Sequence, residues 1–166
     1  MMGNRGRAIA SFAVSIGVTA GAALIGNLAT RSSVRDWYPT LEKPPFNPPS
    51  WVFGPVWSAL YVAMATAAWR VWRAKDDGAD EDAVRRSTTL YGVQLALNSA
   101  WSLLFFGLRS PGAALAEIGV LWAAIVAWYR SAGAIDPPSR WLILPYIAWT
   151  TFAALLNASI WWLNRD

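Results

Sequence analysis

The sequence predicts an all-α integral membrane protein, built as a bundle of five transmembrane helices. Of its 166 residues, 55% are hydrophobic and only 14% are charged, whereas soluble domains carry roughly 25% charged residues. The charges are also clustered, which leaves five stretches long enough to cross a bilayer as a helix of about 20 apolar residues. Four of these stretches lack charge, at residues 8–30, 44–69, 87–108 and 141–164, and the fifth, residues 110–129, contains only Glu117.

A soluble helical bundle is the alternative interpretation of these apolar stretches. Each of its helices would need a polar outer stripe, which the uncharged stretches do not provide. We therefore expect one membrane domain over residues 1–166. Its helices are predicted at about residues 8–28, 51–73, 83–108, 112–131 and 140–163.

The first predicted helix, residues 8–28, follows two arginines, an order that a secretory signal would also show. Its apolar run is longer than the usual 7–15 residues of a signal core, so we favour a retained helix. Ala13, Gly17 and Gly21 recur every four residues in it. Small residues at this spacing let helices pack closely.

The first connection, about residues 30–50, is predicted to be a lid. It contains much of the stretch WYPTLEKPPFNPPSWVFGPVW, which combines aromatic residues with many prolines. Loops this long are often functional. The proline pairs at 44–45 and 48–49 fix φ and hold the chain extended, which limits the entropy that the loop loses on closing. The second helix begins near Trp51, with Pro55 early in it.

The remaining connections are shorter and set the predicted topology. Residues 74–86 are hydrophilic, and turns are expected at residues 110–112 and 136–139. Cations are more frequent on the cytoplasmic side of membrane proteins, so we expect the amino terminus in the cytoplasm and the first loop and carboxyl terminus outside. The cytoplasmic side would carry Arg5, Arg7, Arg70, Arg73, Lys75, Arg85, Arg86, Arg130 and Arg140, against Arg31, Arg35, Lys43, Arg109 and Arg165 on the other side.

Three of the predicted helices have a face of mainly aromatic and apolar residues, because residues three, four, seven or eight apart lie on one side of a helix. A lid and several such faces with few polar groups are typical of a small-molecule pocket. The faces are Phe53, Trp57 and Tyr61; Gln94, Asn98, Trp101 and Phe105; and Trp149, Ala153 and Leu156, with Asn157 beside them.

Four polar side chains lie at membrane depth: Gln94, Asn98, Asn157 and Glu117. An amide facing hydrocarbon is costly, so the three amides are expected to point inward. For each amide we favour a hydrogen bond to a neighbouring helix over a contact with a ligand. An acid inside the membrane is a functional candidate, and an interhelical hydrogen bond by its protonated form is the equally weighted alternative for Glu117.

The composition excludes much enzymatic chemistry. The chain contains neither cysteine nor histidine, which excludes disulfides, thiolate chemistry and imidazole as a metal ligand or general base. One glutamate alone does not make a catalytic site. We expect no metal and no required cofactor. We also expect no nucleic-acid partner, because the net charge of +4 reflects membrane topology.

Three stretches resemble the signature stretches of the TspO/MBR family, which includes tryptophan-rich sensory proteins and translocator proteins. They are WYPTLEKPPFNPPSWVFGPVWSALY, LYGVQLALNSAWSLLFFG and LPYIAWTTFAALLN, and the similarity runs from about Trp37 to the end of the chain. The resemblance implies a five-helix bundle, often a homodimer, with a pocket closed by the first loop. The ligands it implies are porphyrins such as protoporphyrin IX, cholesterol in animal members, and synthetic benzodiazepine-type drugs.

The resemblance also implies particular ligand-binding residues. Trp57 and Trp149 match tryptophans that are linked to light-dependent porphyrin breakdown in some bacterial members, so they are the candidates for any catalytic role. The implied ligand-binding residues are Tyr38, Pro48, Phe53, Trp57, Tyr61, Asn98, Trp101, Ala116, Trp149, Ala153 and Leu156.

The chain departs from the animal members at three positions. Ala158 stands where the animal cholesterol motif has a tyrosine, which argues against animal-type sterol recognition. Ala113 and Ser99 each stand where animal members have a tryptophan. We expect a different drug affinity from the change at Ala113, because it removes an aromatic side chain from the pocket.

We therefore predict a membrane protein that binds porphyrins for tetrapyrrole sensing, handling or transport, with propionate contacts from Arg31, Arg35 and Lys43 at the lid. The alternatives are a light-dependent porphyrin-degrading catalyst, which would depend on the photochemistry of its ligand, and a sterol or lipid transporter. A homodimer is expected through the small residues Gly92, Ala96 and Ala100 of the third helix.

Overall fold

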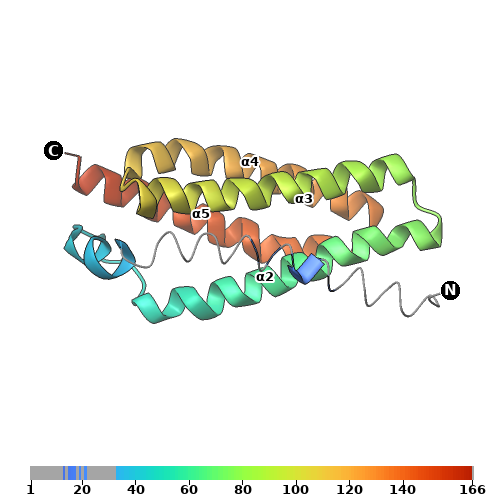
Figure 1. Ribbon diagram of the computed structural model, residues 1–166, viewed down its shortest axis with the longest axis horizontal. Coiled ribbons are helices and arrows are strands. Elements are labelled where there is room, and N and C mark those ends of the chain that lie inside the picture. Colours follow the sequence, from blue (N-terminus) through green and yellow to red (C-terminus); the bar gives the residue numbers. More distant parts are fainter. Residues whose placement is uncertain (1–12, 14, 18, 20, 22–32, 166) are drawn as a thin grey trace.

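The computed structural model describes residues 13, 15–17, 19, 21 and 33–165, and in this part of the chain it contains helices and no strand. The long helices of this part of the chain lie side by side along the molecule (Figure 1). Among the described residues, three helical segments are long and apolar enough to cross a membrane, Ser50–Asp77, Pro111–Ile135 and Ser139–Leu163. The predicted all-α membrane class is thus confirmed. The four helices are α2 (Ser50–Arg73), α3 (Glu81–Ser102), α4 (Pro111–Ile135) and α5 (Ser139–Leu163).

The number of five membrane spans stays a prediction. Most of the first predicted helix, 8–28, lies outside the described residues, although the positions that are described within it are helical. Helix α3 is less apolar than the other three, because it begins with Glu81, Asp82, Arg85 and Arg86 and carries buried amides further along.

Local sequence signals explain where the helices begin and end. Asp80 caps α3 by accepting a hydrogen bond from the backbone N–H of Asp82 at 3.1 Å, which satisfies one of the free donors of the first turn. Gly78 precedes it with φ at 86°, a conformation that costs glycine little. Helix α4 reaches Ile135, about one turn beyond the predicted end at residue 131, and Arg140 donates to the carbonyl of Gly133 in this last turn at 3.0 Å.

The third predicted helix, residues 83–108, is not a continuous α-helix. The α-helix ends at Ser102, and residues Leu103–Gly107 form a π-helical turn. Such turns are frequent at functional sites. This one buries Phe105 and brings Phe106 against it, with ring centroids 4.8 Å apart.

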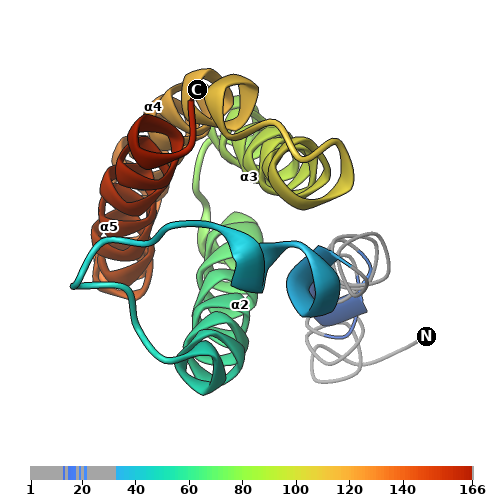
Figure 2. The same ribbon diagram turned by 90° about the vertical axis from the view of Figure 1, so that its left-hand side faces the viewer.

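The helices enclose a common core. Seen along the bundle, α3, α4 and α5 follow one another around a curve, and α2 lies across from them (Figure 2). The core is apolar near its centre, where Met64, Trp128 and Tyr146 are fully buried. The segment from residue 33 to residue 49, called the lid below, crosses one end of the bundle from the α3 side to α5 and returns to α2 (Figure 2).

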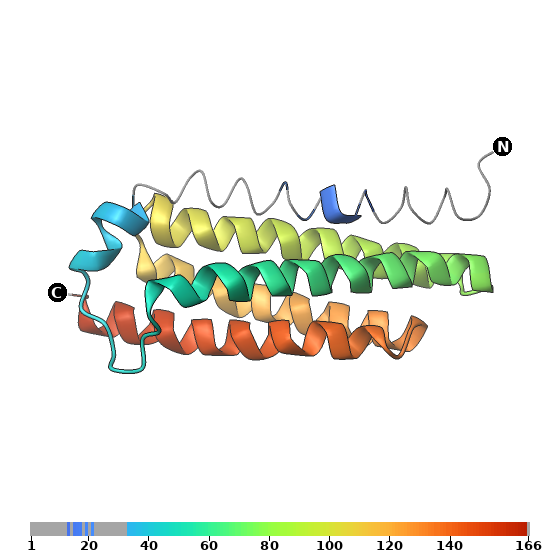
Figure 3. The same cartoon turned by 90° about the horizontal axis from the view of Figure 1, so that it is seen from below.

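A charged cluster joins the helices at the other end of the bundle, where α2 ends and α4 turns into α5 (Figure 3). Arg70 donates two hydrogen bonds to the carboxylate of Asp136, at 2.8 and 2.9 Å. The backbone N–H and the hydroxyl of Ser139 also donate to this carboxylate. Burial alone would raise the pKa of Asp136, but the hydrogen bonds from Arg70 and Ser139 outweigh it and hold the pKa below its ordinary value.

Candidate functional site

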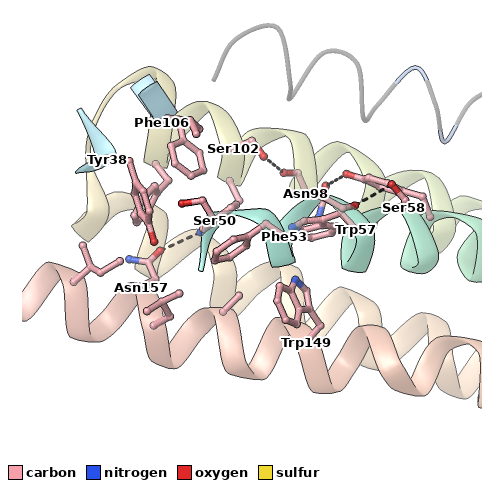
Figure 4. A pocket seen from close by; sticks show the side chains of 18 residues that line it. Tyr38, Ser50, Phe53, Trp57, Ser58, Asn98, Ser102, Phe106, Trp149 and Asn157 are labelled. Atoms are coloured by element: carbon pink, nitrogen blue, oxygen red, sulfur yellow. Dashed lines mark hydrogen bonds between the residues drawn. The ribbon is translucent and has the colours of Figure 1, made fainter. Parts of the chain in front are cut away.

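A cavity of about 410 Å³ lies beneath the lid, between α2, α3 and α5 (Figure 4). Cavities of this size are typical of small-molecule sites. Most of the side chains around it are aromatic or aliphatic. The lining residues are Val34, Tyr38, Ser50, Phe53, Gly54, Trp57, Ser58, Tyr61, Asn98, Trp101, Ser102, Phe105, Phe106, Trp149, Ala153, Leu156, Asn157 and Ile160.

The aromatic wall of α2 follows from the spacing of its residues. Phe53, Trp57 and Tyr61 are four residues apart and all line the cavity. The rings of Trp57 and Tyr61 lie 5.5 Å apart, and Phe53 meets Trp149 of α5 edge-on at 5.8 Å. Edge-on and tilted arrangements are the favoured geometries of aromatic pairs. Two helices therefore hold these rings in place around the cavity.

The wall of α3 continues into the π-helical turn. Trp101 stacks on Phe105, with ring centroids 5.3 Å apart and an interplanar angle of 26°. Phe106 meets Trp101 edge-on at 6.0 Å. Because the π-helical turn shifts the register after Ser102, Phe105 and Phe106 both reach the cavity although they are adjacent in sequence.

Two of the predicted inward amides join helices. Asn98 accepts a hydrogen bond from the hydroxyl of Tyr61 at 3.0 Å and donates to the hydroxyl of Tyr146 at 3.1 Å. Asn157 accepts from the indole N–H of Trp101 at 3.0 Å and donates to the carbonyl of Pro111 at 2.8 Å. The interpretation as interhelical hydrogen bonds is therefore correct for both amides, although both also line the cavity.

Gln94 and Glu117 behave differently from these two amides. Gln94 is fully buried, and neither end of its amide has a partner among the described residues. The carboxylate oxygens of Glu117 are also buried without a partner in this part of the chain. Neither residue lines the cavity. In the described part of the chain, the hydrogen bond expected of Gln94 and the one considered as an alternative for Glu117 are not observed.

The lid contributes Tyr38, which packs on the π-helical turn at 5.8 Å from the ring of Phe106. Its hydroxyl donates to Oδ1 of Asn47 at 2.8 Å. This hydrogen bond joins the outgoing limb of the lid, residues 33–41, to its returning limb, residues 42–49. Burial raises the pKa of Tyr38. The hydroxyl is therefore a neutral donor at any physiological pH.

The α5 wall carries a free polar group. Trp149, Ala153 and Leu156 line the cavity at the helical spacing that predicted them. The indole Nε1 of Trp149 is buried and has no partner among the described residues. A buried donor without an acceptor is costly, so an acceptor on a bound molecule would remove this cost.

Two of the implied ligand-binding residues lie away from the cavity. Pro48 is on the returning limb of the lid, where its carbonyl accepts from Asn47 at 3.2 Å. Ala116 is exposed on α4, a helix that contributes no lining residue because α3 and α5 stand between it and the cavity. The other implied residues line it: Tyr38, Phe53, Trp57, Tyr61, Asn98, Trp101, Trp149, Ala153 and Leu156.

Sequence reasoning missed part of the lining. Ser50, Gly54 and Ser58 also line the cavity, and their spacing of four residues was a usable signal beside the aromatic face of α2. Phe106 could not be found from α-helical spacing, because only the π-helical turn brings it round. Ile160 continues the α5 face one turn beyond Leu156.

The cations expected near the lid have different surroundings. Lys43 donates to the carbonyls of Pro39 and Leu41, at 3.2 and 2.8 Å, and lies 5.0 Å from the centroid of the Tyr38 ring. Arg35 is exposed and forms a loose pair with Asp36 at 3.8 Å. The third expected cation, at position 31, is outside the described residues. No group of three or more acidic side chains that could hold a metal ion occurs among the described residues.

Comparison with known proteins identifies relatives along almost the whole chain. Residues 13–163 match the TspO/MBR family. The chain is 38% identical to the translocator protein of Bos taurus over 145 residues, which cover 85% of this chain and 82% of that protein. It is 36% identical to the tryptophan-rich protein TspO of Chlorobaculum tepidum over 156 residues, covering 94% and 97%.

A third relative is the tryptophan-rich sensory protein of Cereibacter sphaeroides, which is 36% identical over 129 residues, or 78% of this chain and 77% of that protein. The matched range includes all of the described cavity-lining residues. With its long apolar helices, the chain is an integral membrane protein, and it belongs to the TspO/MBR family.

Proposed function

We propose that this protein binds porphyrins such as protoporphyrin IX in the cavity beneath the lid, and that it acts in tetrapyrrole sensing, handling or transport. Membership of the TspO/MBR family supports a membrane role related to tetrapyrroles or sterols. The observation that carries the choice of a porphyrin is the set of aromatic rings that three helices and the lid direct at one cavity.

A porphyrin suits this cavity because it is a flat aromatic ring system. Trp57, Trp101 and Trp149 come from three different helices and line the same space. Each aromatic contact contributes about 0.5–1.5 kcal/mol beyond the burial of apolar surface. The ring nitrogens or carbonyl groups of a ligand would also offer an acceptor to the free indole N–H of Trp149.

The propionates of a porphyrin would lie at the lid, where cations occur. Arg35 is exposed and only loosely paired, so its guanidinium is free to turn toward a carboxylate. Lys43 is held by two carbonyls and the Tyr38 ring, so it would have to leave these partners first. We therefore favour Arg35 over Lys43 as the first propionate contact.

The test is a dark titration of the purified protein with protoporphyrin IX, followed by tryptophan fluorescence. We expect saturable quenching, and at least roughly tenfold weaker binding by Trp57→Ala, because the variant loses one large aromatic face of the cavity. The matched control is Trp141→Ala, since Trp141 is exposed on α5 and does not line the cavity. Equal affinity of Trp57→Ala and the unmodified protein would show that porphyrins do not bind in this cavity.

A further inference from the structure

The side chain of Asn164, just beyond the end of α5, is hydrogen-bonded to the backbone of the lid. The backbone N–H of Glu42 donates to Oδ1 of Asn164 at 3.0 Å, and Nδ2 of Asn164 donates to the carbonyl of Glu42 at 2.9 Å. The same nitrogen donates to the carbonyl of Ile160 at 2.8 Å, which orients the amide on the last turn of α5. The side chain of Asn164 thus binds both the backbone N–H and the backbone carbonyl of Glu42.

Beside these hydrogen bonds, this part of the lid faces α5 across a cleft and makes an aromatic contact with it. An open cleft separates residues 42–45 from α5, lined on the helix side by Ala158, Ser159, Trp162 and Leu163. Beyond the cleft, Phe46 meets Phe152 edge-on at 6.3 Å. Among the described residues, the hydrogen bonds between the lid and the α5 region are the two that join Asn164 to Glu42. Within residues 42–45, Pro44 is buried, whereas Glu42 and Pro45 are exposed. The two bonds from Asn164 therefore fix the exposed residue that precedes this buried proline.

The outgoing limb of the lid, which contains Trp37 and Tyr38, packs on the π-helical turn. Trp37 meets Phe105 at 5.8 Å and Tyr38 meets Phe106 at the same distance. Lys43 binds the carbonyls of Pro39 and Leu41, so residues 38–43 form one connected unit. We therefore expect a displacement at Glu42 to shift Tyr38, which lines the cavity.

We propose that Asn164 is a positioning residue, which holds the lid closed over the cavity and slows the departure of a bound molecule. It acts through Glu42 and the unit around Lys43, and it does not line the cavity itself. The inference rests on the proposed function for the identity of the ligand, but the closure of the lid is independent of that identity.

The geometry predicts different results for substitutions at the two bonded residues. Asn164→Ala removes both hydrogen bonds to the lid. Glu42→Ala keeps both, because they involve only the backbone of Glu42. With each exposed hydrogen bond contributing about a factor of five to the opening equilibrium, we expect lid opening to rise roughly tenfold or more in Asn164→Ala and to stay unchanged in Glu42→Ala.

The first measurement is hydrogen exchange of the lid amides in the ligand-free, full-length protein, for both variants. Faster exchange around residue 42 in Asn164→Ala alone is the expected result. Equal exchange in Asn164→Ala and the unmodified protein would overturn the proposal. This readout does not depend on porphyrin binding, so a failure of the proposed function remains distinguishable.

The second measurement is the dissociation rate of protoporphyrin IX into an excess of albumin. We expect a roughly tenfold faster rate for Asn164→Ala, and an unchanged rate together with faster lid exchange would contradict the retention of ligand by the lid. A protein that binds no porphyrin at all would overturn the retention of this ligand and the proposed function together, while the exchange experiment would still decide on lid closure.

A reversible cross-link separates lid closure from fraying of α5, since Asn164→Ala also removes the bond to Ile160. The chain has no cysteine, so the pair Glu42→Cys and Asn164→Cys provides the one possible disulfide within a chain. Oxidation of the pair should slow lid exchange, and reduction should restore the fast exchange of Asn164→Ala. The same exchange in the oxidised and reduced states of the cross-linked protein would contradict the proposed contact.

Discussion

Two asparagines inside this apolar bundle, Asn98 and Asn157, form hydrogen bonds between helices. Tyr61 of α2, Asn98 of α3 and Tyr146 of α5 form one continuous hydrogen-bonded chain. Asn98 is almost fully buried, so each of its amide atoms depends on these partners. These hydrogen bonds connect the wall of the cavity with the centre of the core, because Tyr61 and Asn98 line the cavity while Tyr146 is fully buried.

At this scale we predict that Tyr61→Phe destabilises the protein. The change removes the hydroxyl that donates to Oδ1 of Asn98, and it leaves a buried acceptor unsatisfied at a cost of about 1–2 kcal/mol. Thermal unfolding in detergent measures the effect. Ser58→Ala is the control, because the hydroxyl of Ser58 donates only to Gly54 of its own helix at 2.9 Å. If Tyr61→Phe were as stable as Ser58→Ala, the hydrogen bonds that join Tyr61, Asn98 and Tyr146 would not contribute to stability as proposed.

The helices differ in how their ends are fixed. Helix α5 is tied to the lid at one end by Asn164 and to α2 at the other end by the cluster of Arg70, Asp136 and Ser139. The hydroxyl of Ser139 also approaches the carbonyl of Ala67 at 3.4 Å. The cluster closes the end of the bundle that lies opposite the cavity, so it stabilises the scaffold without contact to the lining residues.

The cluster predicts a pH dependence of stability. The pKa of Asp136 in the folded protein lies below the ordinary value of 3.8. A carboxylate of this kind stabilises the fold above its unfolded pKa, and the stabilisation is lost as the pH falls through the folded pKa. We therefore expect the unmodified protein to be about 1–2 kcal/mol more stable than Asp136→Asn above pH 4, with a difference that shrinks in more acidic solution.

Unfolding of both proteins between pH 7 and pH 3 in detergent would test this prediction. Asp76→Asn is the control at the same end of the bundle, because Asp76 is exposed and pairs with Arg73 only at 3.9 Å. If the stability difference between the unmodified protein and Asp136→Asn were the same at every pH, the charge of Asp136 would not contribute to stability.

On the scale of the whole molecule, we propose that the chain forms a homodimer through α3. Gly92 and Ala96 are exposed in the single chain and Ala100 is half-buried, and a Cβ added at Gly92 would meet no atom within 4 Å. Small residues four apart allow two helices to approach closely in a membrane. None of the described residues therefore covers Gly92 closely on this face, which we propose is the contact with a second copy.

The prediction is that Ala96→Leu converts the dimer to a monomer, because the larger side chain would keep the two helices apart. The detergent-corrected mass from light scattering measures the oligomeric state. Ala123→Leu is the matched control, since Ala123 is exposed on α4. If the dimer persists in Ala96→Leu, the contact lies on another face.

The sequence alone was sufficient for the membrane class and the aromatic faces. Clustered charges delimit the apolar stretches, and a spacing of four residues places Phe53, Trp57 and Tyr61 on one side of α2 whatever surrounds it. The resemblance of the signature stretches to the TspO/MBR family, now shown along residues 13–163, depended only on the order of residues. Periodicity and composition are local properties, so they can be read without knowledge of packing.

Only the tertiary structure decided which faces meet and what joins them. It moved Ala116 to the outside of the bundle, brought Phe106 to the cavity through the π-helical turn, and paired Asn164 with the backbone of Glu42. These results depend on the order of the helices around the bundle, on a local change of helical register, and on contacts between residues far apart in sequence. None of the three leaves a periodic signal along the chain, because each arises where separate helices come together.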